Sequence, residues 1–359
     1  MPVNVTLADM SNESSSVSQD RPVIVITGAN GFLGRKLVSA AVSRGWNVRA
    51  TIRETGSRPV FPEGVRTQTI DLGADESQWR AALAGVDVVV HAAARAHILK
   101  ETAADPAQAF ASLNTEATER IALAAAACGV KRFVFVSSIG VNGSSTESGA
   151  FTEQSAENPS SPYALSKRNA EIALRKVAAD HSMQTVIVRP PLVYGPEVKA
   201  NFLRLLALVD RDLPLPFEGS DNRRSFIFVD NLVDLILTCC VHPAAAGETF
   251  LAGDGSEFST RGLILELSKR MGRRGRLFHL PAPVMKFAAQ LLGRRSVYEQ
   301  LCCSLEVNAA KAGRKLDWRP IVPPQSGLDS TVKWFVESNA RRQRNLSPRH
   351  AGDGEAGGA

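Results

Sequence analysis

Short apolar runs alternate with helical patterns over the first half of the chain. The strand-like runs are residues 23–26, 48–52, 86–91, 132–136 and 185–189. The segments with the spacing and flanking residues of helices are 32–43, 77–83, 107–128 and 162–180. Strands that are apolar throughout and alternate with helices belong to parallel sheets covered on both faces. The pattern therefore predicts an α/β fold with a doubly wound parallel sheet of the Rossmann type.

This regularity falls after residue 190, where Pro, Gly and longer irregular stretches become frequent. The helical patterns that remain are residues 200–210, 231–241, 259–270 and the apolar stretch 277–293, which we expect to be a packed helix. We predict a dinucleotide-binding domain over residues 21–189 and a smaller C-terminal α/β domain, mainly for substrate, over residues 190–338. The polar, Ser-rich residues 1–20 and the Arg-, Gly- and Ala-rich residues 339–359 are expected to be disordered tails.

Composition narrows the classes of protein without defining one. The 359 residues are 44% hydrophobic and 22% charged, which is enough for a substantial core. No signal peptide or membrane-spanning run is evident, so we expect a cytoplasmic protein without a membrane partner. The five cysteines include two adjacent pairs, and neither they nor the six histidines have metal-ligand spacing. We therefore expect reduced thiols and no metal site.

The net charge of +6 comes partly from arginines near the C-terminus. No nucleic-acid-binding motif accompanies them, so we interpret that segment as solubilising and expect no nucleic-acid partner. Elsewhere the positive balance suits a phosphate-bearing substrate. The arginines in question are Arg341, Arg342, Arg344 and Arg349.

Three glycines stand between the first predicted strand and the first predicted helix. Gly28 permits a tight turn, a side chain at Gly31 would hold the backbone away from a pyrophosphate, and Gly34 allows close packing of strand and helix. The helix N-terminus then offers free N–H groups and a positive partial charge to phosphates. The spacing Gly-x-x-Gly-x-x-Gly resembles the extended short-chain dehydrogenase/reductase superfamily. The predicted cofactor contacts of this segment are Gly28, Asn30, Gly31, Phe32, Leu33, Gly34 and Arg35.

The end of the second strand bears on the choice between NAD and NADP. Residues 49–53 contain no acidic residue that would hold the ribose hydroxyls of NAD. Arg53 is suited to the 2′-phosphate of NADP, with Arg35 as a second candidate, so the sequence favours NADP. Exposed surface arginines are the alternative interpretation. The resemblance also implies cofactor contacts from Asp71 and Leu72, from Ala92, Ala93 and Ala94, and from Pro190.

A Tyr-x-x-x-Lys segment carries the candidate chemistry. Tyr163 and Lys167 lie on one face of a predicted helix. A tyrosine with a pKa near 10 is a poor acid or base, and we expect the lysine and a bound nicotinamide to lower that pKa. Ser138 follows a strand at the edge where open α/β sheets bind ligands. Each residue alone also fits an ion pair or a cap, but together they resemble the superfamily's catalytic triad.

Further site residues follow from the resemblance. Asn114 is expected to position Lys167 or a water, or to be an ordinary polar residue of the long helix. Residues 223–231 resemble the segment of nucleotide-sugar enzymes in which an arginine meets the diphosphate, which makes Arg224 a substrate candidate. Ser225 replaces the aspartate usual there. Asn201, Ser138 and Tyr163 complete the substrate set, and a UDP-linked sugar is the expected substrate. The resemblance also implies a homodimer formed through residues 107–128 and 162–180.

Several reactions are compatible with this site. A 4,6-dehydratase needs an Asp-Glu pair directly after the strand hydroxyl of Ser138. Ile139 and Gly140 occupy these positions here, so the sequence argues against dehydration. A 4-epimerase holds NAD tightly, whereas a 4-ketosugar reductase exchanges NAD(P)H. The basic residue after the second strand and the sequence Pro190-Pro191-Leu192 favour the reductase, as in bacterial enzymes that form UDP-N-acetylquinovosamine for O-antigen. A UDP-glucose 4-epimerase is the alternative. A non-catalytic NADP-binding sensor is disfavoured because Tyr163 and Lys167 are both present.

Overall fold

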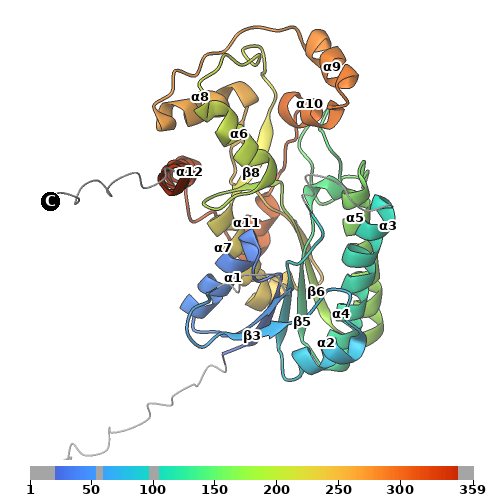
Figure 1. The fold of residues 1–359 in the computed structure, drawn as a ribbon. Coiled ribbons are helices and arrows are strands. Elements are labelled where there is room, and N and C mark those ends of the chain that lie inside the picture. Colours follow the sequence, from blue (N-terminus) through green and yellow to red (C-terminus); the bar gives the residue numbers. More distant parts are fainter. Residues whose placement is uncertain (1–20, 54–59, 97–104, 347–359) are drawn as a thin grey trace, which may run out of the picture.

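The computed structural model describes residues 21–53, 60–96 and 105–346. Its main element is a seven-stranded sheet of order β3-β2-β1-β4-β5-β6-β9, in which every neighbouring pair is parallel (Figure 1). The strands are β1 (Val23–Thr27), β2 (Asn47–Ile52), β3 (Arg66–Thr69), β4 (Val88–His91), β5 (Arg132–Val136), β6 (Gln184–Arg189) and β9 (Thr249–Leu251). The predicted doubly wound α/β fold is confirmed.

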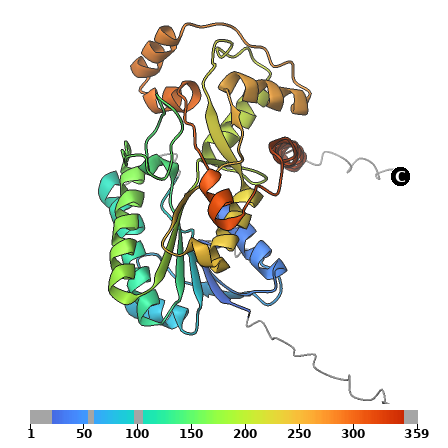
Figure 2. The same ribbon diagram turned by 180° about the vertical axis from the view of Figure 1, so that it is seen from behind.

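The central strands are buried on both faces, and their residues alternate between two cores. In β1, Ile24 and Ile26 face one core, and Val25 faces the other. Helices α1 and α7 cover the first face, and α2, α4 and α5 cover the second (Figures 1 and 2). These helices are α1 (Phe32–Ser43), α2 (Glu76–Leu83), α4 (Ala117–Ala127), α5 (Pro162–His181) and α7 (Val229–Val241).

The chain after residue 190 forms a separate small sheet and also contributes elements to the large sheet. Strands β7 (Leu192–Tyr194), β8 (Arg224–Phe228) and β10 (Glu257–Phe258) form a separate small sheet. However, β9 returns to the large sheet beside β6, and α7 packs against α1. The remaining helices are α6 (Ala200–Asp210), α8 (Thr260–Met271), α9 (Ala282–Leu291), α10 (Arg295–Cys302), α11 (Ala310–Leu316) and α12 (Pro324–Leu346), with 3-10 turns at Ile139–Val141 and Pro243–Ala245.

The long helix predicted over residues 107–128 contains a local change of geometry. It starts as α3 (Pro106–Phe110), widens into a π-helical segment (Ala111–Glu116), and continues as α4. A π-helical turn inserts an extra residue into the helix and is common at functional sites. Here it contains the buried Asn114, one of the predicted site residues.

Two predictions about the C-terminal third are wrong. The tail expected to be disordered from residue 339 is helical up to Leu346, because α12 continues through it. The packed helix expected over residues 277–293 starts only at Ala282, after Pro281, and α9 has no buried residue. The predicted tail at residues 1–20 and the rest of the C-terminal tail, residues 347–359, lie outside the described residues. Among the described helices, none has the length and apolarity needed to cross a membrane.

Candidate active site

The first glycine turn brings bare backbone to the edge of the sheet. Gly28 has a φ of +68°, and a Cβ there would lie 2.8 Å from the Cα of Ala93. A Cβ at Gly34 would overlap the carbonyl oxygen of Gly28, so the helix packs on the turn only without a side chain. At Gly31 the single close neighbour of a Cβ is the Gly28 carbonyl oxygen, at 3.1 Å. The outer face of this turn is therefore free for a ligand that approaches the N-terminus of α1.

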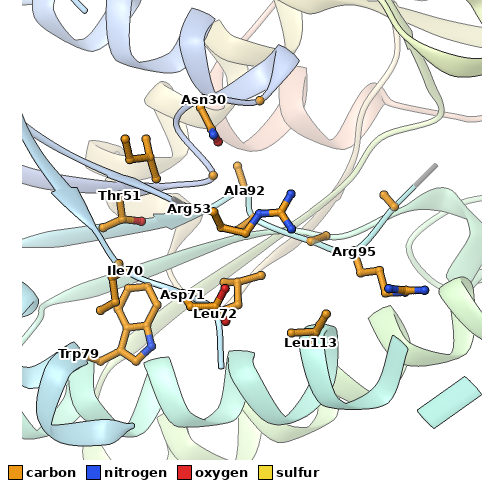
Figure 3. Close-up of a pocket in the computed structure, with 16 residues that line it drawn as sticks. Asn30, Thr51, Arg53, Ile70, Asp71, Leu72, Trp79, Ala92, Arg95 and Leu113 are labelled. Atoms are coloured by element: carbon orange, nitrogen blue, oxygen red, sulfur yellow. The ribbon is translucent and has the colours of Figure 1, made fainter. Parts of the chain in front are cut away.

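A pocket of about 370 Å³ opens beside this turn, at the carboxyl ends of β1, β2 and β4 (Figure 3). Small side chains and backbone on one wall, with Asp71 and Leu72 on another, fit an extended dinucleotide. The indole Nε1 of Trp79 is buried in the lining without a hydrogen-bond partner among the described residues. The predicted cofactor residues that line the pocket are Gly28, Asn30, Gly31, Arg53, Asp71, Leu72, Ala92, Ala93 and Ala94.

Other lining residues were missed by the sequence analysis. Thr51 and Ile52 end β2, so their position at a strand end was a usable signal. Trp79 and Leu113 come from helical segments whose orientation the sequence does not give. The missed lining residues are Thr51, Ile52, Ile70, Trp79, Arg95, Ala96 and Leu113.

The two arginines proposed for the 2′-phosphate have different surroundings. Arg53 extends over the middle of the pocket in Figure 3 and has no ion-pair partner within the described part of the chain. Arg35 instead pairs with Glu197 and does not line the pocket. The structure therefore favours Arg53 as the group that can meet a ligand phosphate. The other predicted cofactor residues that do not line the pocket are Phe32, Leu33, Gly34, Asn114, Tyr163, Lys167 and Pro190.

A chain of buried hydrogen bonds links β1 to the π-helical segment through His91. The hydroxyl of Thr118 donates its proton to the Asn114 carbonyl. The Thr118 oxygen therefore accepts a hydrogen bond from His91 Nε2, at 3.1 Å. The other imidazole nitrogen, Nδ1, then accepts from the Thr27 hydroxyl at 2.7 Å, and Thr27 accepts from the Ala93 amide. Burial lowers the pKa of His91 to about 3, so the ring is neutral. The chain fixes the small-residue loop that follows β4.

Asn114 connects the loop that follows β4 to α5 by hydrogen bonds. Its side-chain oxygen accepts from the Arg95 amide at 2.7 Å, and its nitrogen donates to the Arg95 carbonyl and to Ser166 Oγ. Ser166 in turn donates to the Tyr163 carbonyl at 2.8 Å. Asn114 thus contacts the N-terminal part of α5, which carries Tyr163 and Lys167, through Ser166.

Burial dominates the electrostatics of Tyr163 and Lys167. Lys167 is 2% exposed, and its Nζ lies 4.1 Å from the centre of the Phe135 ring. Desolvation lowers the pKa of Lys167 to about 7, with Glu171 acting in the opposite direction. Desolvation also raises the pKa of Tyr163 to about 12. The predicted lowering of the tyrosine pKa required a bound nicotinamide as well as the lysine, and in the protein alone burial instead raises that pKa.

Ser138 follows β5 and lies beside the start of α5. Its Oγ accepts from the Gly140 amide at 3.1 Å and caps the 3-10 turn Ile139–Val141. A Cβ at Gly140 would lie 3.3 Å from both Ser138 Oγ and the Ala164 Cβ, so this turn packs directly on α5 next to Tyr163. The Pro190 carbonyl accepts from the Ile139 amide at 2.9 Å and joins the ends of β5 and β6.

A buried ion-pair network supports this edge of the sheet. Glu171, one turn after Lys167, accepts from Ser137 Oγ at 2.5 Å and from Arg189 Nε at 2.9 Å. Arg189 also donates to Glu157 at 2.6 Å and to Asn142 at 3.0 Å. The side chains of Glu171 and Arg189 are 0% and 3% exposed. The network therefore ties α5 to the ends of β5 and β6 and to the loop before α5.

The predicted substrate residues beyond the sheet contact α10. Arg224 Nη1 donates to the carbonyls of Glu299 and Cys303, the latter at 2.7 Å. Asn201 donates to the Gln300 side chain at 2.6 Å. Ser225, in place of the expected aspartate, is buried and accepts from the Val307 amide. The structure brings Arg224 and Asn201 to the same short helix but does not place them against the glycine turn.

The fold and the site together define a Rossmann-type protein of the short-chain dehydrogenase/reductase class, with a pocket beside the glycine turn and with Tyr163 and Lys167 one helical turn apart on α5. The model of the NAD dependent epimerase/dehydratase family matches residues 24–253. The chain belongs to this family.

Similar proteins span nearly the whole chain. A UDP-glucose 4-epimerase of Vibrio cholerae is 37% identical over 323 residues, which cover 89% of this chain and 97% of the relative. A ceramide reductase of Caulobacter vibrioides is 30% identical and covers 88% of this chain and 95% of its own length. A crystal structure of the dTDP-glucose 4,6-dehydratase DesIV of Streptomyces venezuelae, with NAD bound, is 27% identical, with a TM-score of 0.72 and coverage of 89% and 98%.

Proposed function

We propose that this chain is an NADP-dependent reductase of the C4 ketone of a UDP-linked 4-keto-6-deoxy-N-acetylhexosamine, forming UDP-N-acetylquinovosamine for cell-surface polysaccharide. The observation that carries the choice of reductase is Arg53 in the pocket lining, which has no ion-pair partner among residues 21–53, 60–96 and 105–346. A cation at that position suits NADPH, which a reductase binds and releases in each turnover. The UDP-glucose 4-epimerase from Vibrio cholerae supports a UDP-sugar as the substrate class.

The proposed chemistry needs one proton at the C4 oxygen of the sugar. A cofactor held on the glycine turn would supply the hydride. Tyr163 Oη then donates its proton to the C4 oxygen, and Ser138 Oγ holds that oxygen with a hydrogen bond. The phenol is protonated at neutral pH, which is the state that reduction uses, although burial raises its pKa and makes it a weaker acid. The Lys167 ammonium stabilises the phenolate formed as the proton leaves.

We assign the remaining predicted residues to binding. The glycine turn with Asn30, Phe32 and Leu33 would hold the pyrophosphate, and Asp71 and Leu72 the adenine. Ala92, Ala93, Ala94 and Pro190 would lie along the nicotinamide half, with Asn114 holding the loop in place. Arg224 would meet the UDP diphosphate and Asn201 the sugar end. Because Arg224 is committed to the carbonyls of α10, this role needs a rotation of its side chain or of α10.

A UDP-glucose 4-epimerase is the second candidate, favoured by the identity of 37% to the Vibrio cholerae relative. Incubation with NADPH and UDP-4-keto-6-deoxy-N-acetylglucosamine separates the two. We expect one NADPH to be consumed for each sugar reduced, and we expect protein purified without added cofactor to contain no tightly held NAD. Conversion of UDP-glucose to UDP-galactose without NADPH consumption would assign the chain to the epimerases.

We further propose that the protein acts in the cytoplasm as a homodimer. The cysteines described in the structure are free thiols, as in a reducing compartment. Leu165 and Ile172 lie seven residues apart on the outer face of α5 and are 45% and 47% exposed. Light scattering on the wild type and on Leu165→Glu tests this pairing, and we expect the substitution to yield a monomer.

A further inference from the structure

Helix α9 presents an apolar ridge that no described residue covers. The helix has no buried residue and packs mainly on α10. Val284, Phe287 and Leu291 follow helical spacing and are 50%, 69% and 78% exposed. Leu292, at the end of the helix, is 69% exposed. Large apolar side chains gathered on one exposed face indicate a surface that meets a partner.

The same surface is strongly cationic. Residues 267–298 contain eight Lys and Arg residues and no Asp or Glu. Some of these cations pair with carboxylates elsewhere, as Arg273 does with Asp210. Others are exposed and have no ion-pair partner among the described residues, and these are Arg274, Arg276, Lys286 and Arg294. A cationic field of this kind attracts an anionic surface.

The apolar and cationic residues occupy one end of the molecule. This end of the molecule, opposite to α2 in both views, is formed by the last turn of α8, by α9 and by the connection between these two helices (Figures 1 and 2). The apolar side chains of α9 are exposed in a row flanked by cations, which fits a broad surface better than it fits a narrow ligand. A second copy of this face would bring unpaired cations together, and like charges disfavour such an interface.

We propose that α9 and its flanking basic residues dock this protein on membranes that contain anionic lipids. Phe287 and Leu291 would enter the boundary between head groups and acyl chains, with α9 lying parallel to the surface. Lys286, Arg294 and Arg274 would meet the lipid phosphates. The sequence predicted no membrane partner because no segment can span a bilayer, but a helix that lies on the surface needs no such segment.

The docking ridge is joined to the predicted substrate residues. Helix α9 packs on α10, and the carbonyls of Glu299 and Cys303 in and after α10 accept from Arg224. Gln300 accepts from Asn201. Membrane contact through α9 would therefore hold the C-terminal domain at the lipid surface while leaving the sheet and its pocket in solution. This inference depends on surface residues and is independent of the proposed reaction.

Sedimentation of the full-length protein with lipid vesicles tests the docking. We expect the wild type to sediment with vesicles of phosphatidylglycerol and phosphatidylethanolamine and not with phosphatidylcholine alone. Phe287→Ser with Leu291→Ser should lower the partition coefficient by more than about tenfold, because two apolar side chains no longer leave water. Lys286→Gln with Arg294→Gln should also lower it, and added salt should remove the difference between these charge variants and the wild type.

The matched control is Ile321→Ser with Val336→Ser, which removes two apolar side chains that are 60% and 45% exposed outside α9. It should bind vesicles like the wild type. Cofactor binding should be unchanged in all variants, which separates lost docking from unfolding and from failure of the proposed reaction. A wild type that ignores anionic vesicles would overturn the proposal. So would equal binding by the Phe287→Ser/Leu291→Ser variant, which would show that the apolar face of α9 does not enter the membrane.

Discussion

The Nζ of Lys167 lies 4.1 Å from the centre of the Phe135 ring, on the strand that leads to Ser138. The same ring stacks on the neutral imidazole of His91, with centroids 5.7 Å apart. A cation over an aromatic face recovers part of the interaction it loses on leaving water. Even so, burial lowers the pKa of Lys167 to about 7. The charge of the lysine in the free protein is therefore sensitive to pH near neutrality.

This pKa predicts how stability changes with pH. Between pH 7 and 10.5 the folded protein holds the Lys167 amine mostly neutral, whereas the unfolded chain still holds it protonated. Unfolding then takes up a proton, so the contribution of this group to stability rises with pH across that window. We expect Lys167→Met to raise the melting temperature below pH 7, with a gain that shrinks toward pH 10.5. A gain that is the same at all pH values would contradict the assignment.

The buried pair of Glu171 and Arg189 should be important for folding. Glu171→Gln leaves the Arg189 guanidinium buried without its main carboxylate, which is expected to cost about 3–5 kcal/mol of unfolding free energy. Urea denaturation followed by circular dichroism measures this loss. Glu76→Gln, which removes an exposed pair with Arg80, is the matched control and should change stability by less than about 1 kcal/mol. Similar losses in the two variants would show that the network does not stabilise the fold.

The cofactor preference should depend on Arg53. If its guanidinium meets a 2′-phosphate, Arg53→Ala should raise the KM for NADPH about 10- to 100-fold, as expected for hydrogen bonds to a charged group. The KM for NADH should hardly change. Arg35→Ala serves as the control, because Arg35 pairs with Glu197 outside the pocket. Equal effects of Arg53→Ala on both cofactors would contradict NADP selectivity.

Loss of the Tyr163 hydroxyl should stop turnover without stopping cofactor binding. Tyr163→Phe removes the proton donor, and we expect kcat to fall by about 10²- to 10⁴-fold. Fluorescence titration with NADPH should give an unchanged Kd. Tyr298→Phe, on α10, is the matched control and should keep its activity. Cofactor binding by a wild type that turns over no sugar would instead favour a cofactor sensor.

The parts of the site that are local in sequence were predictable. The turn at Gly28 and the helix face shared by Tyr163 and Lys167 depend on neighbouring residues, so spacing was enough to find them. The pKa of Tyr163 depends on how deeply α5 is buried, and Trp79 reaches the pocket from a helix whose orientation comes from packing. Neither is encoded in local spacing.

The chain after residue 190 shows the same limit. The resemblance of residues 223–231 to nucleotide-sugar enzymes suggested Arg224, and the apolar pattern predicted a packed helix around Phe287. Only the structure shows that Arg224 contacts the carbonyls of Glu299 and Cys303 and that Phe287 is 69% exposed. An amphipathic pattern predicts a face that needs a partner, and the partner depends on which elements fold against it.

The most direct test of the proposed reaction follows the hydride. The wild type is incubated with UDP-4-keto-6-deoxy-N-acetylglucosamine and NADPH that carries deuterium at the transferable position of the nicotinamide. We predict a product with one deuterium at C4 of the sugar, formed together with an equal amount of NADP. Recovery of the 4-keto sugar unreduced with no NADPH oxidised, together with conversion of UDP-glucose to UDP-galactose in a parallel incubation, would contradict the account.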